Sequence, residues 1–159
     1  MSALNPYEKF LDGRPLEQIL ATTPKALSAV LESIGAEKSA LAPAPGKWSA
    51  AEIVAHLADC ELVFGFRLRQ TLAEDNPTIQ PFDQDKWAAT YSGISAGQSL
   101  NVFTALRQWN LTLIRTALPA AAARPTTHPE RGAMTFHTIV ETMAGHDLNH
   151  LGQLERMVG

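Results

Sequence analysis

A chain of 159 residues can bury about two-thirds of its unfolded surface in one globular domain, so we expect residues 1–159 to form a single domain. Apolar residues make up 45% and charged residues 18% of the chain, as in ordinary soluble proteins. The net charge of −3 and the lack of a basic run argue against nucleic-acid binding. No apolar stretch approaches the roughly 20 residues that a membrane span needs.

The first ten residues, Met1 to Phe10, lack the charged start and the apolar run of a signal peptide, so we expect none. Cys60 is the one cysteine of the chain, which excludes a disulfide within it. A lone thiol fits a reducing compartment. We therefore expect a cytoplasmic protein.

Helical periodicity first appears from about Pro15 to Ile34, where apolar residues recur at three- and four-residue spacing. Gly35 suits the position just past the end of this helix. Pro24 interrupts the pattern, because it lacks the backbone N–H that a helix interior needs. The sequence leaves two alternatives here, a kinked helix or a second helix that starts with Thr23 as its cap.

The second predicted helix begins after Ser49 and runs to about Leu72. Ser49 and Glu52 have the spacing of a capping box, in which each side chain accepts a hydrogen bond from the backbone N–H of the other residue. Trp48 and Ile53 occupy the two positions of a hydrophobic staple. Together these two features define the start of the helix.

A connection from Ala73 to Gly97 follows, and prolines and glycines interrupt any helical periodicity in it. Connections of this length inside a compact domain are uncommon and often carry a lid or a binding loop. The segment Asp83–Tyr91 predicts a short helix within it. Its Trp87 and Tyr91 are candidate substrate contacts, although we favour simple packing of the loop against the bundle.

A third helix is predicted from about Ser99 to Ala117, closed by Pro119, and a second connection containing Arg124–Gly132 leads to the last helix. The chain shows no alternation of β-branched and polar residues and no Asn-Gly or Asp-Gly hairpin signal. We therefore expect an all-α protein, a four-helix bundle. The long link between the second and third helices predicts a crossover connection at that point.

Three histidines fall on the inward faces of the second and last predicted helices. His146 and His150 lie four residues apart, so their rings are neighbours one helical turn apart. His56 belongs to an apolar stripe with Ile53 and Cys60. Imidazole is the commonest protein ligand of transition metals. The pattern indicates a metal site formed by His56, His146 and His150.

Each ligand histidine has a second ring nitrogen that needs an acceptor, and the candidates are Asp59, Asn149, Gln153 and backbone carbonyls. Asp59, one turn from His56, is also the candidate catalytic residue, either as an orienting group or as a base. A simpler alternative stays open, in which the histidines are hydrogen-bonded core residues without a metal. A protease is not expected, because Asp147 replaces the glutamate of the zinc-protease motif H-E-x-x-H.

Three further residues need a choice between a functional and a structural reading. Cys60 shares the helix face of His56, so its sulfur can reach a metal or act as a thiol. We favour core packing, because free cysteine is among the most buried residue types. His128 lies in a proline-flanked loop and His137 falls outside the inward stripe, so both are expected at the surface.

The segment Pro45–Glu61 resembles the second-helix motif of the DinB/YfiT-like superfamily, and Gly145–Gln153 resembles its C-terminal motif. Asp83–Trp87 and His128–Gly132 resemble landmarks of the family between these motifs. The matching segments follow the expected order over roughly Leu16–Met157. The resemblance therefore covers nearly the whole chain.

The resemblance implies a four-helix bundle with a divalent metal, often nickel or zinc, held by three histidines. Matched by motif position, these ligands are His56, His146 and His150, the same three that the spacing selects. The resemblance also implies a homodimer. It further implies a relationship to transferases and isomerases that use a low-molecular-weight thiol such as mycothiol, bacillithiol or glutathione.

Three neutral ligands leave a metal its full double charge and at least one open coordination position, as in catalytic zinc sites. Such a metal activates a water or a thiol. We therefore expect transfer of a small thiol, or of hydroxide, to a small electrophilic substrate, with the 73–97 connection over the open side. Enzymatic activity stays an open question, since the alternative is a non-catalytic bundle that is stabilised by metal or binds a small molecule. No membrane or nucleic-acid partner is expected.

Overall fold

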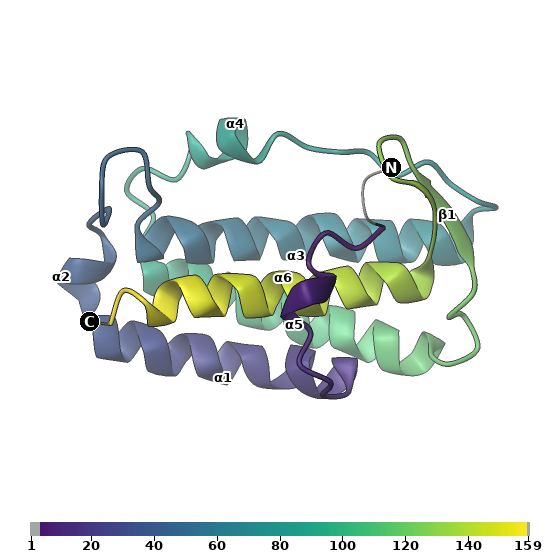
Figure 1. Cartoon of the computed structure of the whole chain (residues 1–159), viewed down its shortest axis with the longest axis horizontal. Coiled ribbons are helices and arrows are strands. Elements are labelled where there is room, and N and C mark those ends of the chain that lie inside the picture. The colour runs from purple at the N-terminus through teal and green to yellow at the C-terminus, as the bar shows by residue number, and fades with distance from the viewer. Residues whose placement is uncertain (1–3, 159) are drawn as a thin grey trace.

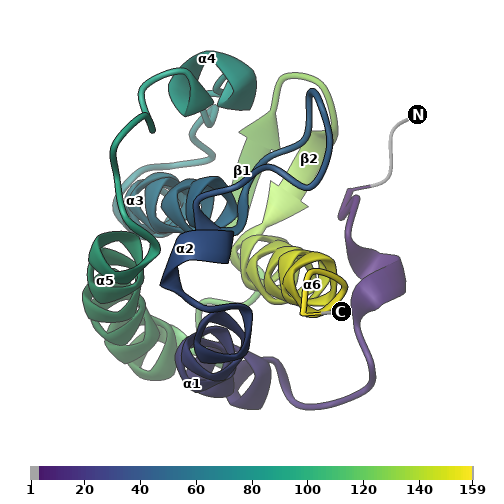
Figure 2. The ribbon, with the colours of Figure 1, turned by 90° about the vertical axis from the view of Figure 1, so that its left-hand side faces the viewer.

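Four long helices form the body of the protein. The computed structural model describes residues 4–158. Residues 1–3 and 159 lie outside the described residues. Both ends of the expected domain, and the first three residues of the segment in which no signal peptide is expected, therefore fall outside them. Viewed along the bundle, the helices occupy the corners of a square, so that each packs against two neighbours (Figure 2). The expected all-α four-helix bundle is confirmed. The helices are α1 (Leu16–Ile34), α3 (Ala50–Ala73), α5 (Ala96–Ala117) and α6 (Phe136–Glu155).

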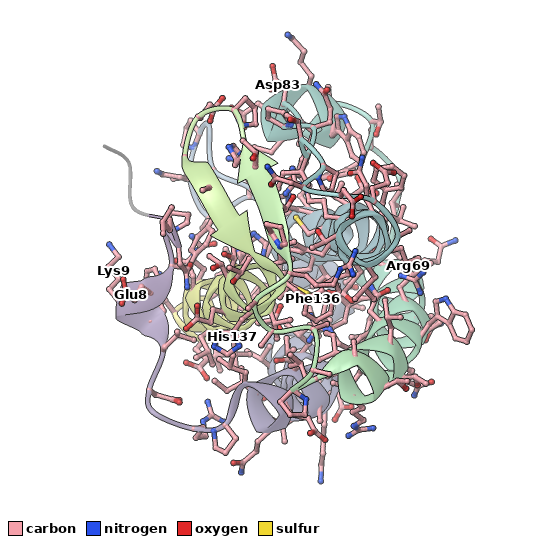
Figure 3. The ribbon with its side chains drawn as sticks, turned by 90° about the vertical axis from the view of Figure 1, so that its right-hand side faces the viewer. Glu8, Lys9, Arg69, Asp83, Phe136 and His137 are labelled. Atoms are coloured by element: carbon pink, nitrogen blue, oxygen red, sulfur yellow. The ribbon has the colours of Figure 1, made fainter. Side chains whose placement is uncertain are left out.

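Shorter elements decorate this bundle. The 3-10 helix η1 packs against α6, while α4 lies outside α3 in the connection that leads to α5 (Figure 1). Figure 3 shows Glu8 and Lys9 pointing away from the bundle at η1, and Asp83 at the outer edge of the molecule at α4. The short elements are η1 (Glu8–Phe10), α2 (Ala36–Ser39), α4 (Gln84–Ala88), β1 (Pro125–His128) and β2 (Gly132–Thr135).

Helix α1 passes through Pro24 without ending. The hydroxyl of Thr23 donates to the carbonyl of Ile19 at 2.9 Å, as in a helix interior, so the alternative of a second helix capped by Thr23 is wrong. Because proline has no N–H, the carbonyl of Leu20, four residues earlier, loses its usual helical donor. The guanidinium of Arg107 on α5 donates to that carbonyl instead, at 3.0 Å.

The predicted start of α3 is confirmed in detail. The backbone N–H of Ser49 donates to the Glu52 carboxylate at 2.7 Å, and the backbone N–H of Glu52 donates to the Ser49 hydroxyl at 3.2 Å. Trp48 packs against the core cluster that contains Ile53, as the staple predicts. These local bonds satisfy backbone groups that a helix end would otherwise leave without partners.

Helix α5 begins earlier than predicted, at Ala96 rather than near Ser99. Its start is a second capping box, formed by Ser95 and Gln98. Apolar periodicity missed this first turn, because Ala96 and Gly97 carry no large side chain to extend the stripe.

The prediction that the chain lacks strands was wrong for the second connection. There β1 and β2 pair antiparallel. The first connection adds to this hairpin, since Ile79 N–H donates to the Thr127 carbonyl and Thr127 N–H to the Pro77 carbonyl, both at 2.9 Å. Strands of four residues are too short to show clear alternation, and the turn at 129–131 lacks the Asn-Gly or Asp-Gly signal. The pairing thus depends on tertiary contacts between the two connections.

The centre of the bundle holds a buried charge cluster, here called the Arg107 cluster and formed by Arg107, Glu61 and Asp147. Arg107 is 1% exposed and donates to the Glu61 carboxylate at 2.7 Å and to both Asp147 oxygens at 2.6 and 3.0 Å. Burial alone would lower the pKa of Arg107, but the carboxylates of Asp147 and Glu61 outweigh it and raise that pKa. With its bond to Leu20, the arginine joins all four long helices.

The connection between α3 and α5 runs back along the outside of the bundle, so these two helices point in the same direction (Figure 1). Among residues 4–158, no helix combines the length and the apolar character needed to cross a membrane.

Candidate metal centre

The three predicted ligand histidines converge between α3 and α6. His146 Nε2 lies 3.1 Å from His56 Nε2 and 3.1 Å from His150 Nε2. One nitrogen from each ring falls within 4.8 Å of the other two. The structure therefore brings together the three histidines that helical spacing selected, across a sequence separation of 90 positions from His56 to His146.

The spacing of these nitrogens suits a transition metal. With metal–nitrogen bonds of about 2.0–2.1 Å and tetrahedral angles, ligand nitrogens lie about 3.3 Å apart. The two separations of 3.1 Å are close to this value. Two neutral Nε2 atoms at such a distance can share only one hydrogen. The three converging rings therefore cannot satisfy the hydrogen-bonding needs of all three Nε2 atoms among themselves. A cation between them would give each ring an acceptor for its lone pair.

Burial keeps the three rings neutral, which is the form that binds a metal. Burial, and secondarily the nearby His150, lowers the pKa of His56 to about 3. Burial also lowers the pKa of His146, with further contributions from His150 and His56. The pKa of His150 falls for the same main reason, although its bond to Gln153 opposes the shift.

Of the residues predicted to orient the histidines, Gln153 is the one that the structure places in contact with a member of the cluster, His150. Its side-chain oxygen lies 2.8 Å from His150 Nδ1, so Nδ1 carries the ring hydrogen and Nε2 keeps its lone pair toward the cluster. Asn149 makes no hydrogen bond to a histidine within residues 4–158, although it borders a cavity beside His150.

Asp59 faces away from the cluster. It accepts a hydrogen bond from the Tyr91 hydroxyl at 2.8 Å, and the two residues line a separate cavity with Ser99 and Val102. The structure thus shows no contact between Asp59 and His56 that would support the predicted catalytic role of Asp59. Tyr91 is buried in this packing, as the structural reading of the loop favoured.

Cys60 borders the cluster and also belongs to the core. Its sulfur lies 3.5 Å from His56 Nε2 and 3.9 Å from His146 Nε2. Burial, and secondarily the Glu61 charge, raises the pKa of the thiol, which keeps it protonated. The side chain packs with the apolar residues between the helices, which agrees with the favoured core reading.

Two aromatic residues that sequence analysis did not assign to the site enclose the cluster. The Tyr7 ring contacts the His146 ring edge-on, with centroids 4.9 Å apart, and the Trp48 ring lies 4.9 Å from that of His56. Gly145 permits the approach of Tyr7, since a Cβ there would lie 2.6 Å from the Tyr7 carbonyl oxygen. A glycine inside a well-defined helix was the one signal for this contact.

Two cavities border the histidines. The larger, about 610 Å³, is lined by Trp48 and His150 among others, and the smaller, about 170 Å³, by His56 and Cys60 among others. Gln84 from the first connection lines both, so this connection does border the site as expected. Trp87, the other candidate substrate contact, packs against Phe82 with ring centroids 4.8 Å apart.

The two remaining histidines differ from each other. His137 is exposed, as predicted. The prediction for His128 was wrong, since this residue is only 3% exposed. The hairpin turns its ring toward α3, where it lines the 170 Å³ cavity together with Arg67 and Arg131. The unpredicted β-pairing accounts for the error, because a free loop would have left the ring in solvent.

The chain belongs to the DinB superfamily, whose family model matches residues 19–154. A protein of Oceanobacillus iheyensis named "Putative metal-dependent hydrolase" is 30% identical over 110 residues, covering 69% of this chain and 64% of the relative. One of the same name from Bacillus cereus is 22% identical over 158 residues, covering 94% and 91%. YfiT from Bacillus subtilis, with an unusual four-helix bundle topology, aligns with a TM-score of 0.79 at 23% identity, covering 89% of this chain and 84% of YfiT.

The similarity to YfiT establishes the fold. The chain spans 64% of the length of the first two curated relatives that it matches. Together, the family and the histidine cluster support metal binding by this bundle.

Proposed function

We propose that this protein is a metal-dependent enzyme in which His56, His146 and His150 hold one divalent ion, nickel or zinc. The observation that carries the proposal is the convergence of three neutral imidazole nitrogens beside two cavities. An ion bound there supplies Lewis acidity, which makes water or a thiol nucleophilic near neutral pH.

The proposed reaction is transfer of hydroxide, or of a low-molecular-weight thiol, to a small electrophilic molecule. The names of the relatives support the hydrolytic form. In this reaction Gln153 would hold the His150 ring in its metal-binding tautomer. Tyr7 and Trp48 would exclude water from two sides of the histidine cluster. The 610 Å³ cavity offers room for the body of the substrate.

A bound metal could also have a purely structural role, in which it stabilises the bundle without taking part in a reaction. A metal bound between α3 and α6 would link these helices whether or not it reacts. The two explanations differ in one property, because a purely structural ion has no position for an external ligand.

The test compares turnover of a panel of activated esters and alkyl halides, with and without thiols, by nickel- or zinc-loaded protein. We expect metal-dependent turnover in the wild type and in His137→Ala, which removes an exposed histidine of the same helix. His150→Ala should have none. A metal that binds tightly but accepts no added thiol, in a protein without turnover, would refute the enzymatic proposal.

We further propose a homodimer that works in the cytoplasm. The family resemblance supports the first statement and the single, buried Cys60 supports the second. Light scattering of the purified protein measures the mass directly, and a monomer at micromolar concentration would contradict the dimer.

A further inference from the structure

The 170 Å³ cavity beside His56 gathers more basic than acidic side chains. Arg67 from α3, His128 from β1 and Arg131 from the hairpin turn all line it. Glu130, whose side chain is exposed, is the single acidic residue in the described lining. The cavity therefore has a surplus of positive charge.

The burial of Arg67 gives this positive charge a cost in free energy. Arg67 is 9% exposed, its Nη2 donates to the Gln80 carbonyl at 2.6 Å, and its Nε has no partner in the described part of the chain. A buried guanidinium loses hydration that one carbonyl does not replace. Burial, and then the charge of Arg131, accordingly lowers the pKa of Arg67. Arg107, by contrast, receives two carboxylates from its own chain.

His128 adds a donor to the same cavity. Its Nδ1 accepts a hydrogen bond from the backbone N–H of Glu130 at 3.1 Å. In the neutral ring the hydrogen then resides on Nε2, which can act as a donor. Burial, followed by the charges of Arg131 and Arg67, lowers the pKa of His128 and favours this neutral form, although the charge of Glu130 opposes the shift. The cavity thus presents N–H donors from three side chains.

The position of this cavity connects it to the candidate metal centre. On α3, His56, Cys60, Phe64 and Arg67 follow three- and four-residue spacing, so they lie along one face of the helix. Helical side chains tilt toward the N-terminus, which brings the arginine back in the direction of the histidine. All four residues line the cavity. One small molecule can therefore contact the arginine and approach the histidines.

We propose that Arg67 and Arg131 bind an anionic group, a carboxylate or a phosphate, of the small molecule that reacts at the histidine cluster. This inference deepens the proposed function and rests on it. A guanidinium matches both kinds of group, because its planar N–H donors bind two oxygens at once. At about 170 Å³, the cavity takes one end of a ligand rather than a whole one. The substrate class is accordingly small anions.

The test begins with metal-free protein, so that it does not depend on the proposed function. Calorimetric titrations measure the affinity of propionate and of inorganic phosphate for the wild type, Arg67→Gln and Arg131→Gln. The matched control is Arg69→Gln, which removes a charge from α3 on the side that contacts Asn110 of α5 (Figure 3). Arg131 lies in a turn, so its variant keeps the test valid if Arg67→Gln does not fold.

The wild type and the control should bind one of the two anions, and the tighter one identifies the group. Both cavity variants should lose about tenfold or more in affinity, the usual effect of removing one charge-assisted hydrogen bond. Equal affinities in all four proteins, or no binding of either anion by the wild type, would overturn the proposal.

A second arm uses zinc-loaded protein and compares 3-mercaptopropionate with the neutral 2-mercaptoethanol. We expect the anionic thiol to bind about tenfold more tightly, with the preference lost in Arg131→Gln. If no metal binds, the proposed function fails, while the metal-free arm still decides whether the anion site exists. A preference that persists in Arg131→Gln and Arg67→Gln would contradict the assignment of these arginines.

Discussion

The Arg107 cluster and the histidine cluster are both buried and polar, yet they are built on opposite plans. Arg107 has two carboxylates and a backbone carbonyl as partners, so its charge is neutralised within the fold. His56, His146 and His150 are three groups of one kind, whose lone pairs face each other and two cavities. The difference teaches that a polar cluster completed by its own chain serves stability, while one left incomplete points to a ligand.

The two clusters touch through one helix. His146 and Asp147 are adjacent on α6, and they project to different neighbours, α3 and α5. The rigid charge cluster therefore holds the helix that carries two of the three histidines. The clusters share this helix, so their effects on stability and on metal binding can be coupled. Mutations that break the Arg107 cluster but spare the histidine cluster, or the reverse, separate the two effects.

The largest effect is expected for Arg107→Met. It leaves the Glu61 and Asp147 carboxylates buried without a counter-ion, which costs about 3–5 kcal/mol in the free energy of unfolding. Urea denaturation measures this loss. The control Arg115→Met breaks an exposed pair with Glu17 and should cost less than about 1 kcal/mol. A loss for Arg107→Met as small as that of the control would show that the cluster does not stabilise the fold.

A metal should stabilise the wild type but not a protein that lacks one ligand. At a free ion concentration of 100 times the dissociation constant, nickel or zinc should raise the free energy of unfolding by about 2.7 kcal/mol. His56→Ala should show no such gain, whereas His137→Ala should behave as the wild type does. An equal gain in all three proteins would place the metal elsewhere.

Acid should destabilise the metal-free protein through the histidine cluster. The pKa of His56 is lowered from 6.5 to about 3 in the fold, so below pH 6.5 the unfolded chain binds a proton that the folded chain does not. Stability is therefore complete above pH 6.5 and falls toward pH 3, by about 2 kcal/mol between pH 7 and pH 5 from this residue. Parallel denaturation curves of the wild type and His56→Leu measure the difference, and identical pH slopes would contradict it.

The smallest of these effects concerns the residue that orients a ligand. Gln153→Leu removes the acceptor of His150 Nδ1 and should weaken metal affinity by about tenfold or more. Competition with a chromophoric chelator measures the change. Asn149→Leu is the matched control, since Asn149 borders the same cavity without bonding to a histidine. An equal loss in both variants would indicate a general effect of the cavity wall.

The contrast between the clusters also explains what the sequence could predict. Helical spacing places His146 and His150 on one inward face, and the capped helix start fixes the register of His56, so the histidine cluster was accessible from local rules. The Arg107 cluster was not, because its partners lie 46 and 40 residues away and α5 carries no local signal for them. Charged residues are normally expected at the surface.

Errors at the edge of the site have the same origin. His128 was expected in solvent because its burial depends on pairing between two connections that lack a strong local pattern. Tyr7 was overlooked because its position depends on the docking of η1 against α6. Local periodicity thus specifies what the long helices present, while the walls of the cavities depend on contacts that no local pattern encodes.

The central claim is that the histidine cluster holds one divalent ion, and elemental analysis tests it most directly. The samples are tag-free wild type, His150→Ala and His137→Ala, each purified without chelators and then dialysed against a nickel and zinc buffer. The account predicts about one ion per chain in the wild type and in His137→Ala, and almost none in His150→Ala. A wild type that takes up no metal under these conditions would contradict it.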